Sequence, residues 1–154
     1  MAMINTDSIM ENEGYINTIY PPQLKLTIEN NDDQKCSFLD MALWIVDNKL
    51  DYKLYDKRDD FPFDIVSYPD LSGNICSSNA YGVFIGQLLR FAKTCNNYDH
   101  FVHRAHLLIQ KLIKQYFKKP QLLTRCYKFY DRHFDYIKKY EVVRENFVKD
   151  LFSY

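Results

Sequence analysis

The densest group of potentially reactive side chains lies in the stretch YDKRDDF, from Tyr55 to Phe61. Four carboxylates fall in or just after it: Asp56, Asp59, Asp60 and Asp64. Carboxylate oxygens bind divalent cations, but Lys57 and Arg58 neutralise part of this cluster, and its spacing is not that of an EF-hand loop. We therefore predict a turn with local ion pairs. A metal-dependent nuclease centred on Asp56–Asp64 is kept as a third hypothesis.

Histidines and nucleophiles give weaker signals. Three histidines recur at every third position of one predicted helix: His100, His103 and His106. No carboxylate follows them to complete a metalloprotease pattern, so we predict a basic, partly exposed helical face and no metal site. His133 falls in an apolar stripe and is predicted to be a core histidine with its hydrogen bonds satisfied. No serine or cysteine has the sequence context of a nucleophile, and we predict no catalytic residue.

The cysteines and the apolar runs indicate a cellular setting. The four cysteines are too widely spaced for a metal-binding motif: Cys36, Cys76, Cys95 and Cys126. Since no signal peptide opens the chain, we expect an intracellular protein, cytoplasmic or nuclear, with reduced, buried and inert thiols. No apolar run reaches the roughly 18 residues of a membrane helix, so no membrane partner is expected.

Unpaired cations at helical spacing are the strongest chemical signal. Residues 1–100 contain 8 Lys/Arg and 15 Asp/Glu, whereas residues 101–154 contain 12 and 5, giving net charges of −7 and +7. Two consecutive predicted helices each place four cations on one face: Arg104, Lys111, Lys114 and Lys118, then Arg125, Lys128, Arg132 and Lys139. Acidic partners at i,i+4 are almost absent between Arg104 and Lys128.

Such faces suit a polyanion. Phosphate groups bind to rows of cations, and three nearby tyrosines could stack on bases: Tyr127, Tyr130 and Tyr136. We therefore predict contact with nucleic acid. Two alternatives stay open: a solvated, lysine-rich helix face, and pairing between the acidic and basic parts of the chain.

The elements that position these groups begin with strands. Leu24, Leu26 and Ile28 alternate with polar residues and predict a strand, and a polar loop follows at residues 29–35. The apolar stretch Phe38–Val46 predicts a second strand, buried on both faces. A turn at residues 47–49 and a half-buried strand at Leu50–Tyr55 complete a hairpin. Residues 61–79 are an irregular connection and the main boundary in the chain.

Beyond residue 79 the apolar spacing is helical. The first helix is predicted at Ala80–Cys95, and Pro120 separates the second helix from the third because proline suits a first turn. Three apolar stripes are expected to face the core: Phe84, Leu88, Phe91 and Cys95; Phe101, Ala105, Leu108, Leu112 and Tyr116; Leu122, Cys126, Phe129, His133 and Ile137. The helical period continues through Tyr140, Val143, Phe147 and Leu151. We predict an α+β fold, with a short antiparallel sheet or hairpin (about 23–55) followed by three or four helices (about 80–152).

Several blocks of the chain occur in an order known from a protein family: IYPPQLKL, CSFLDM, LYDKRDDFPFDIVSYP, NICSSNAYGVFIGQLLRFAKTC and LLIQKLIKQYF. From about residue 15 to 140 the chain resembles the downstream end of the reverse transcriptase region in animal retroelement polyproteins. In that family the catalytic Tyr-x-Asp-Asp turn precedes the block matched here by YINTIYP. The aspartate pair should fall near Ala2 and Met3, where no adjacent aspartates occur, although two-metal nucleotide transfer needs them.

The resemblance implies a fragment of an RNA-directed DNA polymerase from a transposable element, inactive alone. It implies a palm-end strand and hairpin unit (15–75) and a thumb-like helical unit (76–154), and the few, aperiodic apolar residues before them predict a frayed N-terminus (1–14). The implied partners are an RNA–DNA or DNA duplex and the remainder of the reverse transcriptase. No cofactor is implied for the fragment, since Mg²⁺ would serve only the complete polymerase. In the corner YDKRDDF, Lys57 and Arg58 would touch phosphate, while Asp59 and Asp60 would fix them or cap local backbone.

The predicted interface combines the corner with the two helices. Its members are Lys57, Arg58, Arg104, Lys111, Lys114, Lys118, Arg125, Lys128 and Arg132. We predict no metal ligand. The alternative is a degenerate helical scaffold acting as a protein-interaction module, which would expose apolar residues where the missing palm should pack. The candidates for that patch are Phe38, Trp44 and Phe63.

Overall fold

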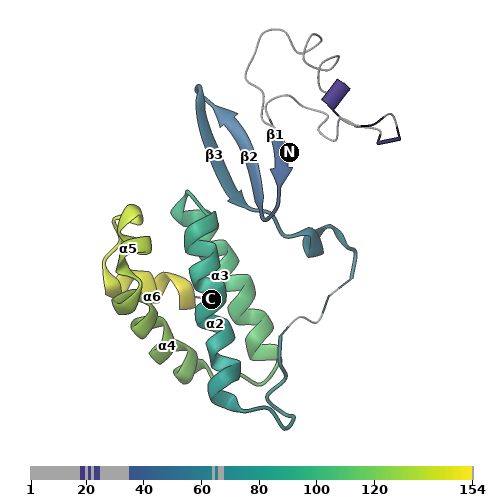
Figure 1. Cartoon of the computed structure of the whole chain (residues 1–154). Coiled ribbons are helices and arrows are strands. Elements are labelled where there is room, and N and C mark those ends of the chain that lie inside the picture. Colours follow the sequence, from purple (N-terminus) through teal and green to yellow (C-terminus); the bar gives the residue numbers. More distant parts are fainter. Residues whose placement is uncertain are drawn as a thin grey trace. The chain divides into compact units, whose positions relative to one another are not determined.

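The computed structural model describes residues 35–63, 65 and 68–153, together with 18, 19, 21, 23 and 24. The chain forms two compact units, Met1–Asp33 and Gln34–Tyr154. In the first, the Leu24 amide donates to the Pro21 carbonyl at 2.9 Å and so closes a turn. Leu26 and Ile28 of the predicted first strand lie outside the described residues. In the second unit an antiparallel sheet precedes the helices, which confirms the predicted α+β fold (Figure 1).

The sheet has three described strands: β1 (Lys35–Phe38), β2 (Met41–Val46) and β3 (Lys49–Leu54), paired in that order. The β2–β3 turn has φ 49° at Asp47 and 58° at Asn48. Left-handed conformations at both central residues match the right-handed twist of a hairpin, and Asp and Asn tolerate them well. The predicted turn and hairpin are confirmed.

The predicted strand Phe38–Val46 is wrong in two respects. Leu39 has φ 53° and forms a turn with Asp40, so Phe38 ends a separate strand, β1, which also includes Lys35 from the predicted loop. The strand is also not buried on both faces, because Ile45 and Val46 are 47% and 49% exposed. The turn was missed because leucine in an apolar run gives no turn signal. The burial was overestimated because, in the described structure, no layer covers the turn end of the hairpin.

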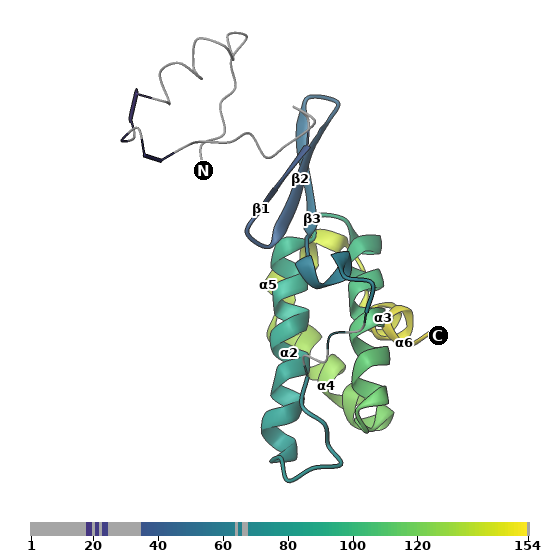
Figure 2. The same ribbon diagram turned by 90° about the vertical axis from the view of Figure 1, so that its right-hand side faces the viewer.

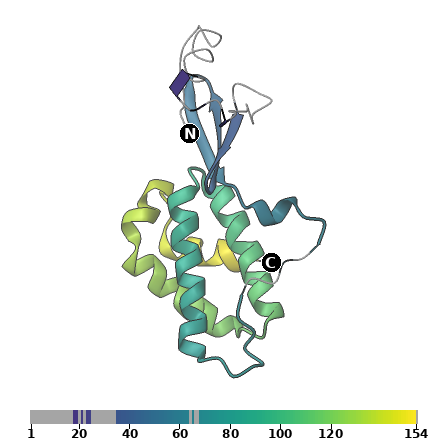
Figure 3. The ribbon, with the colours of Figure 1, turned by 45° about the vertical axis from the view of Figure 1, so that its right-hand side comes forward.

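Five described helices follow the sheet: α2 (Ser77–Thr94), α3 (Tyr98–Lys114), α4 (Lys119–Arg132), α5 (Phe134–Ile137) and α6 (Arg144–Phe152). Both α2 and α6 pack against α3 and α4 (Figures 2 and 3). The four longer helices confirm the predicted bundle of three or four. No helix in the described part of the chain is long and apolar enough to cross a membrane.

The core forms where the apolar stripes of the helices meet. Phe147 of α6 lies at its centre, with ring centroids 5.6 Å from Phe101 and 6.3 Å from Phe129. Leu54, the last residue of β3, is buried and belongs to the same cluster. The Asn96 amide after α2 donates to the Tyr52 carbonyl at 3.2 Å. The end of the sheet is thus joined to the bundle.

Three residues of the predicted stripes leave the core. Tyr116 and Val143 are exposed, and His133 is half-buried beside the Phe129 ring. The last predicted helix is also broken, by the 3₁₀ turn η2 (Lys138–Tyr140) and by Glu141 with φ 52°. Tyr116, with φ 66°, and Glu141 both have the left-handed backbone conformation that glycine usually adopts at a helix end. Neither residue type signals a helix end in the sequence.

The four cysteines differ in burial. Cys95 and Cys126 are buried as predicted, and burial raises the pKa of Cys126 to about 12. For Cys76 the prediction is wrong, because its thiol is exposed at the start of α2, and its pKa is lowered by a hydrogen bond with the Ser78 hydroxyl. Cys36 on β1 is half-buried. All four are free thiols.

Candidate nucleic-acid interface

The stretch YDKRDDF folds as the end of β3 followed by the 3₁₀ turn η1 (Lys57–Asp60). Asp56 caps this turn by accepting a hydrogen bond from the Arg58 amide at 3.2 Å. The same carboxylate holds the Arg58 guanidinium through two bonds of 2.8 and 2.5 Å. The bonded guanidinium lowers the Asp56 pKa to about 2. This is the local ion pair that the sequence predicted, although Asp56 and not Asp59 or Asp60 holds Arg58.

The other carboxylates of the corner have separate partners. Asp59 forms an ion pair with Arg104 of α3, and Asp60 accepts a hydrogen bond from the Tyr55 hydroxyl at 2.6 Å. That bond raises the pKa of Tyr55. Among the described residues no group of three or more His, Cys, Asp or Glu side chains could hold a metal ion. Asp64 lies outside the described residues.

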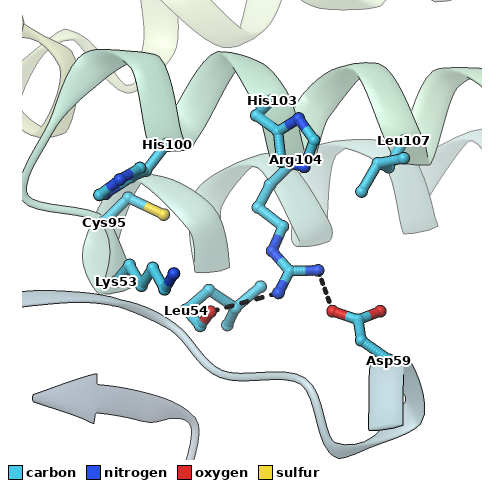
Figure 4. Close-up of a pocket in the computed structure, with 8 residues that line it drawn as sticks. All are labelled: Lys53, Leu54, Asp59, Cys95, His100, His103, Arg104 and Leu107. Carbon is cyan, nitrogen blue, oxygen red and sulfur yellow. Dashed lines mark hydrogen bonds and ion pairs between the residues drawn. The ribbon is translucent and has the colours of Figure 1, made fainter. Parts of the chain in front are cut away.

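A pocket of about 320 Å³ lies between this corner, the end of β3 and α3 (Figure 4). Four nitrogen-bearing side chains and one carboxylate line it: Lys53, His100, His103, Arg104 and Asp59. Arg104 reaches across from α3 to Asp59 and to the Leu54 carbonyl, 3.3 Å from its Nη2. The side chain of Arg104 is only 18% exposed. Arg104 therefore links α3 to the corner. Its charge is already paired with Asp59, which weakens its predicted role as a phosphate contact.

The histidines on this side of α3 are separated by their contacts. The ring of His100 meets Trp44 of β2 edge to face, with centroids 6.1 Å apart. His106 bonds the Asp150 carbonyl through Nε2 at 2.6 Å, which ties α3 to α6. His103 is exposed. The basic helical face predicted from the triplet is therefore used partly for packing.

Replacing Arg104 with alanine should lower the free energy of unfolding by about 1–3 kcal/mol, because it leaves the Leu54 carbonyl and Asp59 without their partner. Replacing Lys114, which is exposed on the same helix, should change it by less than about 0.5 kcal/mol. Urea denaturation of both variants measures the difference. Equal, small effects would contradict a linking role for Arg104.

Most of the other predicted cations have no carboxylate partner in the described part of the chain. Seven of the nine form no ion pair with any residue that the structure describes: Lys57, Lys111, Lys114, Lys118, Arg125, Lys128 and Arg132. Arg58 and Arg104 are the two paired ones. A cation without a carboxylate partner keeps its charge available for a bound anion. Most cations of the predicted interface are therefore not neutralised by carboxylates of the described residues.

Three of these cations lie on one face of α4. Arg125, Lys128 and Arg132 follow one another at spacings of three and four, which places them side by side on a helix. The core-facing residues of the same helix are Leu122, Cys126, Phe129 and Tyr130. The basic stripe predicted for α4 therefore lies outside the buried face.

Lys139, predicted as the fourth member of that stripe, does not belong to it. It lies in η2, where its ammonium group donates to the Cys95 carbonyl at 2.7 Å and sits 4.9 Å from the centre of the Tyr140 ring. Burial lowers its pKa. The fold uses this cation to satisfy the carbonyl group that follows α2.

The tyrosines predicted for stacking also have other contacts. Tyr130 is buried, and its hydroxyl donates to the Val142 carbonyl at 2.8 Å. The Arg144 guanidinium lies 4.6 Å from the centre of the Tyr127 ring. The Lys93 ammonium lies 5.1 Å from the centre of the Tyr136 ring. Each of the three tyrosines thus already contacts another group of the protein, so none has a ring free for stacking in the described structure.

The positive charge is concentrated around the connection from α3 to α4. The stretch Arg104–Lys128 contains no Asp or Glu. The face of four cations predicted for the second helix is wrong in one respect, because α3 ends at Lys114 and Lys118 is the N-cap residue of α4. The stretch also includes Lys119, an exposed residue in the first turn of α4 that helical spacing did not identify. We call the following seven residues the basic surface: Lys111, Lys114, Lys118, Lys119, Arg125, Lys128 and Arg132.

Within the described residues, few ion pairs join the acidic part of the chain to the basic part. Of the five ion pairs between described residues, only Arg104–Asp59 joins residues 101–154 to the first hundred. Two carboxylates after the basic stretch pair with other cations, Asp131 with Arg144 at 2.7 Å and Asp135 with Lys138 at 3.0 Å. Among the described residues, the alternative that the two parts face each other is therefore supported by one ion pair.

Comparisons with protein-family models, with curated proteins and with solved structures find no significant match for this chain.

Proposed function

We propose that the chain binds nucleic acid through the basic surface, as the palm-end and thumb-like part of a retroelement reverse transcriptase without catalytic activity of its own. One observation carries this proposal. The basic surface has seven cations, and none of them forms an ion pair with a described residue. Backbone phosphates are the natural counter-charges for such a surface, since their binding releases condensed counterions.

The chemistry of the surface determines the kind of binding. Lysine and arginine side chains on a helix face contact phosphate oxygens, which fix position without reading sequence. The expected ligand is therefore a duplex, an RNA–DNA hybrid in the first place, bound without sequence preference. Lys57 on η1 is exposed and without an ion pair among the described residues, so it remains a candidate for a further phosphate contact.

The resemblance to reverse transcriptases supports the second half of the proposal. An antiparallel strand unit followed by a helical bundle agrees with a palm end followed by a thumb. The corner between them is stabilised internally by the ion pair Asp56–Arg58, and the ion pair Asp59–Arg104 joins it to α3. A corner held in this way would keep a thumb-like bundle in place on a duplex.

Titration of a labelled RNA–DNA hybrid at two ionic strengths tests the proposal. Between about 50 and 200 mM salt, a protein making six to ten phosphate contacts loses roughly 10³–10⁵ in affinity. We expect a loss near the lower value, and equal binding of a hybrid with shuffled sequence. Weak binding at low salt, or an affinity that does not change with salt, would contradict the proposal.

Exposed apolar residues favour one second candidate, a protein-interaction module. At the turn end of the β2–β3 hairpin, Ile45, Val46 and Leu50 are all exposed. Of the residues predicted for such a patch, Phe63 is exposed, while Phe38 and Trp44 are half-buried. Gel filtration over a range of concentrations would support this candidate if it showed self-association that Leu50→Lys removes.

A further inference from the structure

Tyr116 has a backbone conformation that suits glycine. It follows α3 with φ 66°. The Phe117 amide donates to the Leu112 carbonyl and the Tyr116 amide to the Ile113 carbonyl, both at 3.1 Å. This is the hydrogen-bond pattern of a helix C-cap in which the left-handed residue is most often glycine, because a side chain is strained there. The sequence places a large aromatic residue at the position.

The turn around Tyr116 is held firmly on both sides. Phe117 is buried, and its ring meets the ring of Tyr81 at 5.0 Å. The Tyr81 hydroxyl accepts a hydrogen bond from the Lys118 amide at 2.9 Å, and the Gln115 carbonyl accepts one from the Leu71 amide at 3.1 Å. Tyr116 itself is 65% exposed. Its ring is therefore presented from a fixed backbone and contributes little to packing.

The residues next to Tyr116 in the sequence are rich in cations. Three exposed lysines lie within three residues of it: Lys114, Lys118 and Lys119. Ile113, which is also exposed, adds apolar surface. No carboxylate occurs between Arg104 and Lys128. An exposed ring beside several cations is the combination that binds single-stranded nucleic acid, since every base has a face for stacking and every linkage carries a phosphate.

We propose that Tyr116 stacks on an unpaired base of a polynucleotide whose neighbouring phosphates lie against Lys114, Lys118 and Lys119. This inference rests on the proposed function and adds that the ligand has a single-stranded segment at the α3–α4 connection. Within a duplex the base faces are already covered by their neighbours. The duplex and the single-stranded segment would both contact Lys114 and Lys118, whereas only the single-stranded segment would use the Tyr116 ring.

The test compares two labelled strands of equal length and charge, an oligo(dT) and an oligomer made of abasic sites. Fluorescence anisotropy with the full chain measures binding of each strand. Tyr116→Phe should bind oligo(dT) within twofold of the unaltered protein, because the ring remains. Tyr116→Gly should bind it about tenfold more weakly, because base stacking on an aromatic ring is lost. Binding of the abasic strand should be the same for all three proteins.

Three controls keep the test from depending on folding or on the loss of any exposed ring. Tyr116→Gly should raise the midpoint of thermal unfolding by a few degrees, because glycine relieves the strain of the left-handed position. Tyr116→Asn, which also tolerates that position, provides a second variant without the ring. Phe63→Ala removes a comparably exposed aromatic residue, 63% exposed, from outside the α3–α4 connection, and should leave binding unchanged.

The outcomes separate this inference from the proposed function. Undiminished binding of oligo(dT) by Tyr116→Gly, with binding of the hybrid intact, would overturn the stacking role alone. Equal losses for the base-bearing and abasic strands would also overturn it, since they would reflect charge or shape. Failure of the unaltered protein to bind the hybrid and both strands at about 50 mM salt would overturn both proposals.

Discussion

Replacing Lys111, Lys114 and Lys118 with glutamate should weaken binding of an RNA–DNA hybrid by a hundredfold or more at about 50 mM salt. Three phosphate contacts are lost, and three carboxylates then repel the backbone. Stability should change little, because none of the three lysines has an ion pair among the described residues. Lys114 and Lys118 are exposed and Lys111 is half-buried, and surface substitutions typically cost less than about 0.5 kcal/mol each. Anisotropy titrations together with urea denaturation measure both effects.

A matched variant with the same change in net charge is the control. Lys49, Lys93 and Lys149 are exposed and lie outside the basic surface, on β3, α2 and α6. Their replacement with glutamate should lower affinity only by the weak, screened effect of net charge. If both triple variants lost binding equally, attraction would be a property of the whole chain and the basic surface would have no special role.

Replacing Phe147 with alanine should lower the free energy of unfolding by about 3–5 kcal/mol, a large share of the roughly 5–15 kcal/mol typical of a domain. Phe147 is fully buried. Its ring lies 5.6, 6.3 and 5.3 Å from those of Phe101, Phe129 and Tyr130, so its removal leaves a cavity where α3, α4 and α6 meet. Urea denaturation followed by circular dichroism measures the loss.

Phe134→Ala is the comparison for this variant. Phe134 begins α5 and is 48% exposed, so its truncation should cost at most about 1 kcal/mol. Similar losses for the two phenylalanines would mean that α6 is not packed into the bundle.

Much of the fold was predictable because its signals are local. Asp47 and Asn48 allow a hairpin turn, Pro120 suits a helix start, and the spacing of Phe84, Leu88 and Phe91 predicts a buried helix face. The misses occurred at Leu39, Tyr116 and Glu141, which have positive φ without being glycine. At each of these residues a helix or strand ends. The turn at Tyr116 is stabilised by the contact of Phe117 with Tyr81, which lies far away in the sequence. Such a contact cannot be predicted from local residue types.

The interface was predictable to the extent that it depends on helix spacing. Arg125, Lys128 and Arg132 share a face of α4 as their intervals indicated. Pairing across the chain was not predictable: Arg104 meets Asp59, which is 45 residues away. Lys139 meets the Cys95 carbonyl for the same reason, since only the folded bundle brings η2 to the end of α2. The acidic corner was correctly predicted as ion-paired, but its partners depend on the same long-range folding.

Mass spectrometry of lysine acetylation, with and without the RNA–DNA hybrid, tests the central claim most directly. Exposed lysines react with the reagent, and those covered by phosphate react more slowly. We expect protection at Lys111, Lys114, Lys118, Lys119 and Lys128, with Lys49 and Lys149 unchanged. Protection of Lys49 and Lys149 instead, or reaction of the basic surface at the same rate with bound hybrid, would contradict the assignment of these helices to nucleic-acid binding.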